Sequence, residues 1–174
     1  MENSDNVLSA DNQQERFSIK SIPTGIGNFL SGFALGESSF MIVCRPRSDY
    51  RRKWKISLAF NVSQHDIVPL ELFWRTLGCG GLRRAGNNGW YFEVNSLAQI
   101  RQRVIPFFER FPIIGSKAND FAAFKTAADI LAQTAITDAD YTKVLSLRES
   151  MNNGGKRKYL KEKILRDYTP KSDT

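Results

Sequence analysis

The chain has 174 residues, a length that suits one compact domain and leaves little room for two. Lys and Arg number 25 against 18 Asp and Glu, and this net charge of +7 favours a polyanionic partner such as nucleic acid, although many basic proteins bind none. Two cysteines exclude a disulfide framework and a cysteine-rich zinc site, and the single histidine, His65, excludes a nuclease built around clustered histidines.

The domain organisation is simple, and we find no internal repeat. Residues 1–16 are polar and predict a mobile tail, residues 17–152 a folded domain, and residues 153–174 a basic C-terminal segment. The start of the chain lacks the basic and apolar stretches of a signal peptide, and no apolar run is long enough to span a membrane. We therefore expect a soluble intracellular protein, in the cytoplasm or an organelle matrix, with no membrane partner.

The first predicted helix runs from about Pro23 to Gly36. Phe29, Leu30 and Phe33 give it a helical apolar pattern, and Thr24 is placed to cap its start. Gly32 and Gly36 lie four residues apart and so share one helix face, where small residues let a second helix approach closely.

Two strands are predicted next, at 40–47 and 53–63, joined by a basic turn. In the first, Phe40, Ile42 and Cys44 share one face, opposite Met41, Val43, Arg45 and Arg47. In the second, Trp54, Ile56, Leu58, Phe60 and Val62 alternate with Lys53, Lys55, Ser57, Ala59, Asn61 and Ser63. This period of two predicts a sheet with one buried face and one polar face.

The rest of the chain predicts a helix, a second hairpin and further helices. A helix is expected at 65–77, strands at 82–84 and 90–94 around a glycine- and asparagine-rich loop, a helix capped by Ser96 that runs to about Arg110, and helices at 119–133 and 137–151. Loop 111–116 precedes the first of the last two helices. This order predicts an α+β fold with helices on one face of an antiparallel sheet.

The polar face of this sheet has the side chains that read DNA. The major groove admits a two-stranded β-ribbon, whose side chains project towards successive bases at every second residue. The candidate contacts are Arg45, Arg47, Lys55, Ser57, Asn61, Ser63, Arg83 and Tyr91. Arg suits guanine, Asn suits adenine and Lys suits phosphate. The alternative is an ordinary solvated strand face.

Residues 30–40 carry a recognisable motif. They read Leu-Ser-Gly-Phe-Ala-Leu-Gly-Glu-Ser-Ser-Phe, which resembles the LAGLIDADG motif of homing endonucleases. Leu35 stands where the motif usually has an acid, and Ser38 where it usually has glycine. Residues 58–64 resemble the family's strand that ends in a polar pocket residue, here Gln64. Residues 111–121 resemble its loop that carries a pocket lysine, here Lys117.

The resemblance implies a fold, a site and partners. The fold is αββαββα, with the antiparallel sheet forming a DNA-binding saddle and Gly32, Phe33 and Gly36 in a helix interface between two units. With one motif in the chain, a homodimer is expected. Glu37 and the Gly36 carbonyl would bind Mg²⁺, or another divalent cation such as Mn²⁺, and Gln64 and Lys117 would complete the catalytic set.

The implied activity is metal-dependent hydrolysis of DNA. The product would be a staggered double-strand break at a long pseudo-palindromic site. Two alternatives remain open, an intron RNA maturase and a DNA-binding protein that has lost cleavage.

Overall fold

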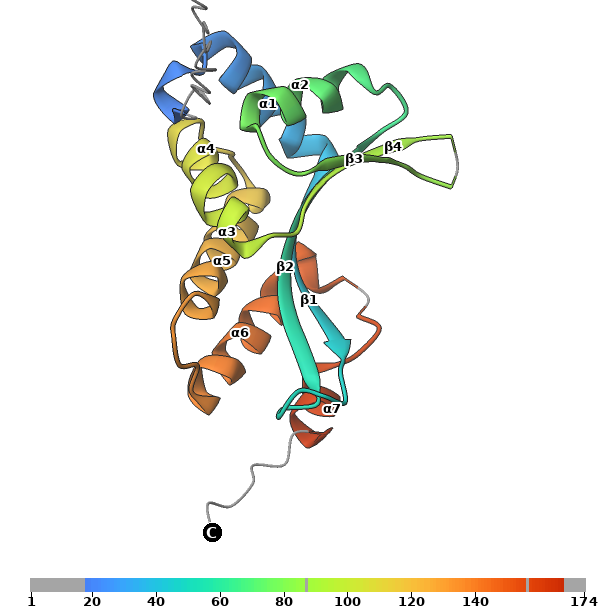
Figure 1. Cartoon of the computed structure of the whole chain (residues 1–174), viewed down its shortest axis with the longest axis vertical. Coiled ribbons are helices and arrows are strands. Elements are labelled where there is room, and N and C mark those ends of the chain that lie inside the picture. The colour runs from blue at the N-terminus through green and yellow to red at the C-terminus, as the bar shows by residue number, and fades with distance from the viewer. Residues whose placement is uncertain (1–17, 87, 156, 168–174) are drawn as a thin grey trace, which may run out of the picture.

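The computed structural model describes residues 18–86, 88–155 and 157–167 (Figure 1). In chain order the elements are η1 (Ile19–Ser21), α1 (Thr24–Glu37), β1 (Ser38–Pro46), β2 (Trp54–Gln64), α2 (Val68–Leu77), β3 (Gly81–Arg84), β4 (Trp90–Val94), α3 (Leu97–Gln99), the π-helical η2 (Ile100–Val104), α4 (Ile105–Arg110), α5 (Ser116–Leu131), α6 (Asp138–Ser150), η3 (Asn152–Gly154) and α7 (Lys161–Asp167). Within these described ranges, no helix has both the length and the apolar character needed to cross a membrane.

The four strands form one antiparallel sheet in the order β1-β2-β4-β3. β1 and β2 pair along their whole length, from Ser38 opposite Val62 to Pro46 opposite Trp54. The hairpin of β3 and β4 joins the sheet through β4, which pairs with the second half of β2. Helices α3 to α6 lie along one side of the sheet (Figure 1). The predicted α+β fold is confirmed.

A cluster of phenylalanine rings fills the space between the sheet and its helices. Phe40 of β1 lies 5.2 Å from Phe60 of β2, 5.2 Å from Phe108 of α4 and 5.3 Å from Phe124 of α5, measured between ring centroids. These rings are at most 1% exposed. The alternation predicted for both long strands is therefore confirmed, because one face of each is buried here and the other is left towards solvent.

Several helix boundaries differ from the sequence-based prediction. Thr24 does not cap α1, since it is the first helical residue and Pro23 occupies the cap position. The second helix begins at Val68 rather than at residue 65, and the Asp66 carboxylate accepts a hydrogen bond from the Val68 N–H at 2.9 Å. α5 begins at Ser116, three residues before the prediction, so Lys117 lies in its first turn.

The helix predicted from Ser96 to Arg110 is continuous but contains a wide π turn. The Ser96 side chain caps it by accepting a hydrogen bond from the Gln99 N–H. The π turn η2 comes directly before α4, which has Pro106 at its start. Proline has no N–H to donate to the preceding turn, and such bulges accommodate a break of this kind.

The basic C-terminal segment packs onto the far end of the sheet. Ile164 of α7 is completely buried in a second apolar cluster with Cys44, Trp54, Tyr141 and Leu145. α7 therefore does more than present a charged surface to solvent, because it covers the end of the β1–β2 hairpin.

Candidate nucleic-acid interface and active site

The register of the sheet brings most of the predicted DNA contacts onto one face. Directly opposed residues of antiparallel strands project to the same side. Arg45 lies opposite Lys55, Val43 opposite Ser57, Ser39 and Glu93 opposite Asn61, Tyr91 opposite Ser63, and Arg83 opposite Tyr91. This face is the one turned away from the phenylalanine core, so its side chains are available to a ligand.

Two of the predicted arginines already have partners within the chain. Arg47 binds the Asp49 carboxylate in the hairpin turn at 2.5 Å, and this hydrogen bond lowers the pKa of Asp49 to about 2. Arg83 lies 3.4 Å from the Glu93 carboxylate and 4.4 Å from the centroid of the Tyr91 ring. Glu93 was not among the predicted site residues, although its place in the strand alternation puts it on the polar face.

Arg45 and Lys55 are different, because they face each other across the two strands. Among the described residues, neither side chain forms an ion pair or a hydrogen bond. Two cations at facing positions repel each other, which a bound anion would relieve.

Glu37 lies where α1 passes directly into β1. The side-chain hydroxyl of Ser38 donates to the Ala34 carbonyl at 2.6 Å, and the Ser38 N–H donates to the same carbonyl. These bonds end the helix and fix the turn, leaving Glu37 exposed at its last position. The last carbonyls of a helix have no helical partner and carry partial negative charge, so this end of α1 favours a cation.

A pocket of about 260 Å³ brings Glu37 and Gln64 together. Its lining also includes Ser63, His65, Ala85, Gly89, Trp90 and Tyr91. The Gln64 side-chain carbonyl accepts a hydrogen bond from the His65 N–H at 2.7 Å, which orients the amide. His65 and Trp90 were not predicted, and the sequence offers no signal that would bring them to this pocket.

Lys117 reaches the same end of α1 from the first turn of α5. Its Nζ donates to the carbonyl of Ser38, the residue that follows Glu37. Partial burial lowers the Lys117 pKa, and the negative charges of Asp120 and Glu37 offset part of this effect. The structure therefore places Gln64 in one pocket with Glu37, and Lys117 outside the lining of that pocket but close enough to Glu37 to respond to its charge. Asp120 was missed, although its spacing of three from Lys117 places both on one face of α5.

The described part of the candidate metal site contains few protein ligands. In the described parts of the chain, no group of three or more His, Cys, Asp or Glu side chains lies close enough to hold an ion. Among the described residues that line the pocket Glu37 is the one acid, and Gly36 precedes it in the chain. Oxygen ligands of this kind suit Mg²⁺, which binds through one or two carboxylates and completes its shell with phosphates and water.

Two glycines of α1 face open space. A Cβ atom added at Gly32 or at Gly36 would meet no atom within 4 Å. Phe29 and Leu35 on this helix are 51% and 37% exposed, and Ile114 nearby is 68% exposed. Phe33, predicted to lie in the interface, is half-buried and packs on Phe73, with the ring centroids 6.3 Å apart.

The molecule is an α+β protein whose antiparallel sheet leaves one basic face open, and an acid lies at the end of the helix beside this sheet. The model of the family described as LAGLIDADG endonuclease matches residues 30–128, and the chain therefore belongs to this family. The match includes the motif at the end of α1 and all four strands.

Curated relatives come from a fungus and are much longer than this chain. Probable intron-encoded endonuclease 2 of Neurospora crassa is 30% identical over 138 residues, which are 77% of this chain and 29% of the relative. Probable intron-encoded endonuclease 3 of the same organism is 29% identical over 71% of this chain and 24% of its own length. The chain thus spans less than a third of the curated relatives it matches.

Solved structures share the fold. I-SmaMI bound to an uncleaved DNA target in the presence of calcium ions superposes with a TM-score of 0.69 and 26% identity, over 76% of this chain and 46% of that one. The homing endonuclease I-TnaI superposes with a TM-score of 0.70 at 22% identity, over 81% of this chain and 94% of its own. This chain therefore corresponds to less than half of I-SmaMI and to nearly all of I-TnaI.

Proposed function

We propose that this protein is a site-specific DNA endonuclease, a homing endonuclease that makes metal-dependent staggered double-strand breaks at a long pseudo-palindromic site. The observation that carries the proposal is that Glu37 and Gln64 share one pocket at the end of a basic sheet face, with Lys117 bonded to the residue that follows Glu37. I-SmaMI, which has the same fold, binds a DNA target.

The sheet face supplies recognition. Asn61, Ser57 and Ser63 lie in one row along β2, where their side chains repeat at the spacing of a strand and can contact successive base edges. Arg45 and Lys55 at the far end would bind guanine or phosphate. Arg47 and Arg83 would first have to release their carboxylate partners, so we expect them to contribute less.

The residues near Glu37 divide the chemical work. Glu37 and the Gly36 carbonyl would hold Mg²⁺ or Mn²⁺, which when bound lowers the pKa of water and neutralises charge on the phosphate. Gln64 would orient the attacking water through its amide. Lys117, as an ammonium close to Glu37, would stabilise the negative charge that develops on the phosphate, or would alternatively help to activate the attacking water.

The active form would be a homodimer built around α1. One unit presents a single carboxylate at the pocket, and a two-fold axis through the open faces of two α1 helices would place a second Glu37 near the first. The exposed Phe29 and Leu35 would be buried there. A symmetric dimer in turn requires a target that is nearly palindromic.

A cleavage selection tests the proposal. The protein is incubated with a randomised duplex library, with and without Mg²⁺, and the new ends are sequenced. A Mg²⁺-dependent staggered cut at one long, nearly palindromic site is the expected result. Absence of cleavage with tight duplex binding would indicate an inactive DNA-binding protein, and selective binding of a structured intron RNA would indicate a maturase; either would contradict the proposal.

A further inference from the structure

The free edge of β1 borders a groove that the activity described so far does not use. β1 is an edge strand, and the segment from Met151 to Asp167 runs along its open side (Figure 1). Two adjoining cavities of about 500 Å³ and 490 Å³ lie between them and share Pro46 and Tyr159 in their walls. We call this pair of cavities the edge groove.

Two arginines, the buried Arg148 and the half-buried Arg157, build the outer wall of the edge groove. Arg148 is 6% exposed, and its guanidinium donates to the Tyr159 carbonyl at 2.9 Å and to the Glu149 carboxylate at 2.9 Å. Arg157 donates from Nη2 to the carbonyls of Arg148 and Met151, both at 2.6 Å. These bonds tie Arg157 and Tyr159 to the end of α6, so this wall of the groove is held by the folded structure.

The charge of the edge groove is strongly one-sided. Among the residues that the structure describes, its walls contain seven Arg or Lys residues and one acid, Asp167. The Asp167 carboxylate pairs with Lys163 at 3.1 Å and accepts from the Trp54 indole N–H at 3.2 Å. Arg45, Lys53 and Lys158 form no side-chain ion pair or hydrogen bond with any residue that the structure describes. The groove therefore has spare positive charge.

Backbone donors add to this charge. The Asn152 side-chain amide donates to the Phe40 carbonyl at 3.3 Å, so the backbone groups of Phe40 point away from β2. Since backbone direction alternates along a strand, the N–H groups of Ile42 and Cys44 also point into the groove. Cationic side chains beside free backbone N–H groups are the usual partners of phosphate oxygens.

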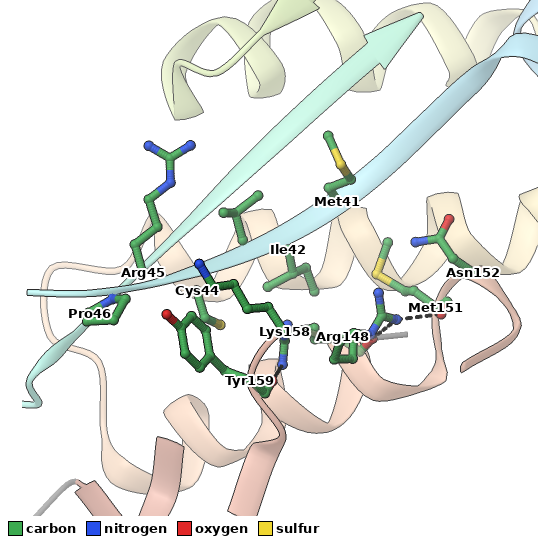
Figure 2. A pocket seen from close by; sticks show the side chains of 12 residues that line it. Met41, Ile42, Cys44, Arg45, Pro46, Arg148, Met151, Asn152, Lys158 and Tyr159 are labelled. Atoms are coloured by element: carbon green, nitrogen blue, oxygen red, sulfur yellow. Dashed lines mark hydrogen bonds between the residues drawn. The ribbon is translucent and has the colours of Figure 1, made fainter. Parts of the chain in front are cut away.

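Arg45 connects the edge groove to the face of the sheet that would bind DNA. It lies opposite Lys55 on that face and also lines the groove. Figure 2 shows Arg45 projecting from β1 and Lys158 rising from the opposite wall. A nucleic acid strand on the sheet would therefore meet the rim of the groove without leaving a basic surface.

We propose that the edge groove binds the phosphodiester backbone of duplex DNA that flanks the part read by the sheet, with Lys53, Lys158 and Arg45 as the phosphate contacts. This inference rests on the proposed function, since it assumes that a duplex lies on the sheet. These contacts would lengthen the footprint and raise affinity without reading sequence.

The test measures how duplex binding depends on salt. Each lost phosphate contact makes the slope of log affinity against log salt shallower by about 0.9. Because each substitution is present in both subunits of the proposed homodimer, we expect Lys158→Gln to change the slope by about 2 and Lys53→Gln/Lys158→Gln by about 4, with the same loss for every target sequence. The matched controls are Lys143→Gln and Lys20→Gln/Lys143→Gln, which remove equal charge from exposed positions of α6 and η1.

A second readout shows where the contact lies. Trimming base pairs from both ends of the target should weaken binding by the wild type more than by the double variant, and cleavage at saturating protein should be unchanged in both. If the double variant keeps the control slope while the wild type cleaves DNA, the edge groove inference fails and the proposed function stands. If the variant loses RNA binding alone, the groove serves RNA and the inference is again wrong. If the wild type binds no duplex, both proposals fail.

Discussion

Replacing Gly32 with alanine tests whether the open face of α1 packs against a second unit. Within one unit a Cβ at this position meets no atom within 4 Å, so the methyl group causes no clash. Alanine is favoured over glycine inside a helix by about 1 kcal/mol. The isolated unit should therefore become more stable by about this amount.

Dimerisation, by contrast, should become weaker in the Gly32→Ala variant. If two α1 helices approach backbone to backbone at Gly32, each new methyl group must be accommodated in the contact, and overpacking of this kind costs about 1–3 kcal/mol. Since 1.4 kcal/mol is a factor of ten, the dissociation constant of the dimer should rise by about 5-fold to 150-fold.

Two measurements separate these effects. Urea unfolding at low protein concentration reports the stability of the unit, and analytical ultracentrifugation over a concentration series reports association. Gly81→Ala is the control, because it also adds a methyl group into open space but lies on the edge strand β3. A Gly32→Ala variant that associates as the wild type does would refute a close helix contact at α1.

Three further results are expected. Gly27→Ala should destabilise the protein by about 1–3 kcal/mol in urea unfolding, because its Cβ would lie 2.3 Å from the buried Phe111 ring; an unchanged midpoint would contradict this packing. Burial raises the pKa of both Cys44 and Cys79 from 9.0 to about 11, so both thiols should resist iodoacetamide at pH 8 until the protein unfolds, and rapid alkylation of the native protein in mass spectrometry would contradict this burial. Their contribution to the free energy of unfolding should be present below pH 9 and should fall as the pH rises from about 9 to 11. Asn61→Ala should relax base preference at one position of each half-site by about 1–3 kcal/mol, whereas an equal loss of affinity for every sequence in the cleavage selection would assign Asn61 to phosphate.

Much of the fold could be predicted because its strands have strong alternation. In β2, five apolar side chains from Trp54 to Val62 occupy every second position, which only a strand can place on one face. The start of α5 was missed because Ser116, Lys117 and Ala118 have no apolar periodicity, and the helix begins directly after Gly115, whose φ of 68° favours glycine. Local sequence carries no comparable sign of this boundary.

The site was only partly predictable for a related reason. Glu37, Gln64 and Lys117 came from the resemblance to a family, since a strand-end glutamine and one lysine among many cations have no distinctive local pattern. The walls of the edge groove depend on contacts between residues more than 100 positions apart, such as that between Asn152 and Phe40. Such contacts become visible only when the chain is folded.

The most direct test of the account compares the wild type with Glu37→Gln on the target found by cleavage selection. The amide keeps the shape of the side chain but removes the charge that would hold a divalent cation. We expect Glu37→Gln to bind the duplex with nearly wild-type affinity and to lose Mg²⁺-dependent cleavage by at least about 100-fold, a loss of about 2.7 kcal/mol of transition-state stabilisation. Full cleavage by this variant would contradict the assignment of Glu37, and with it the proposed active site.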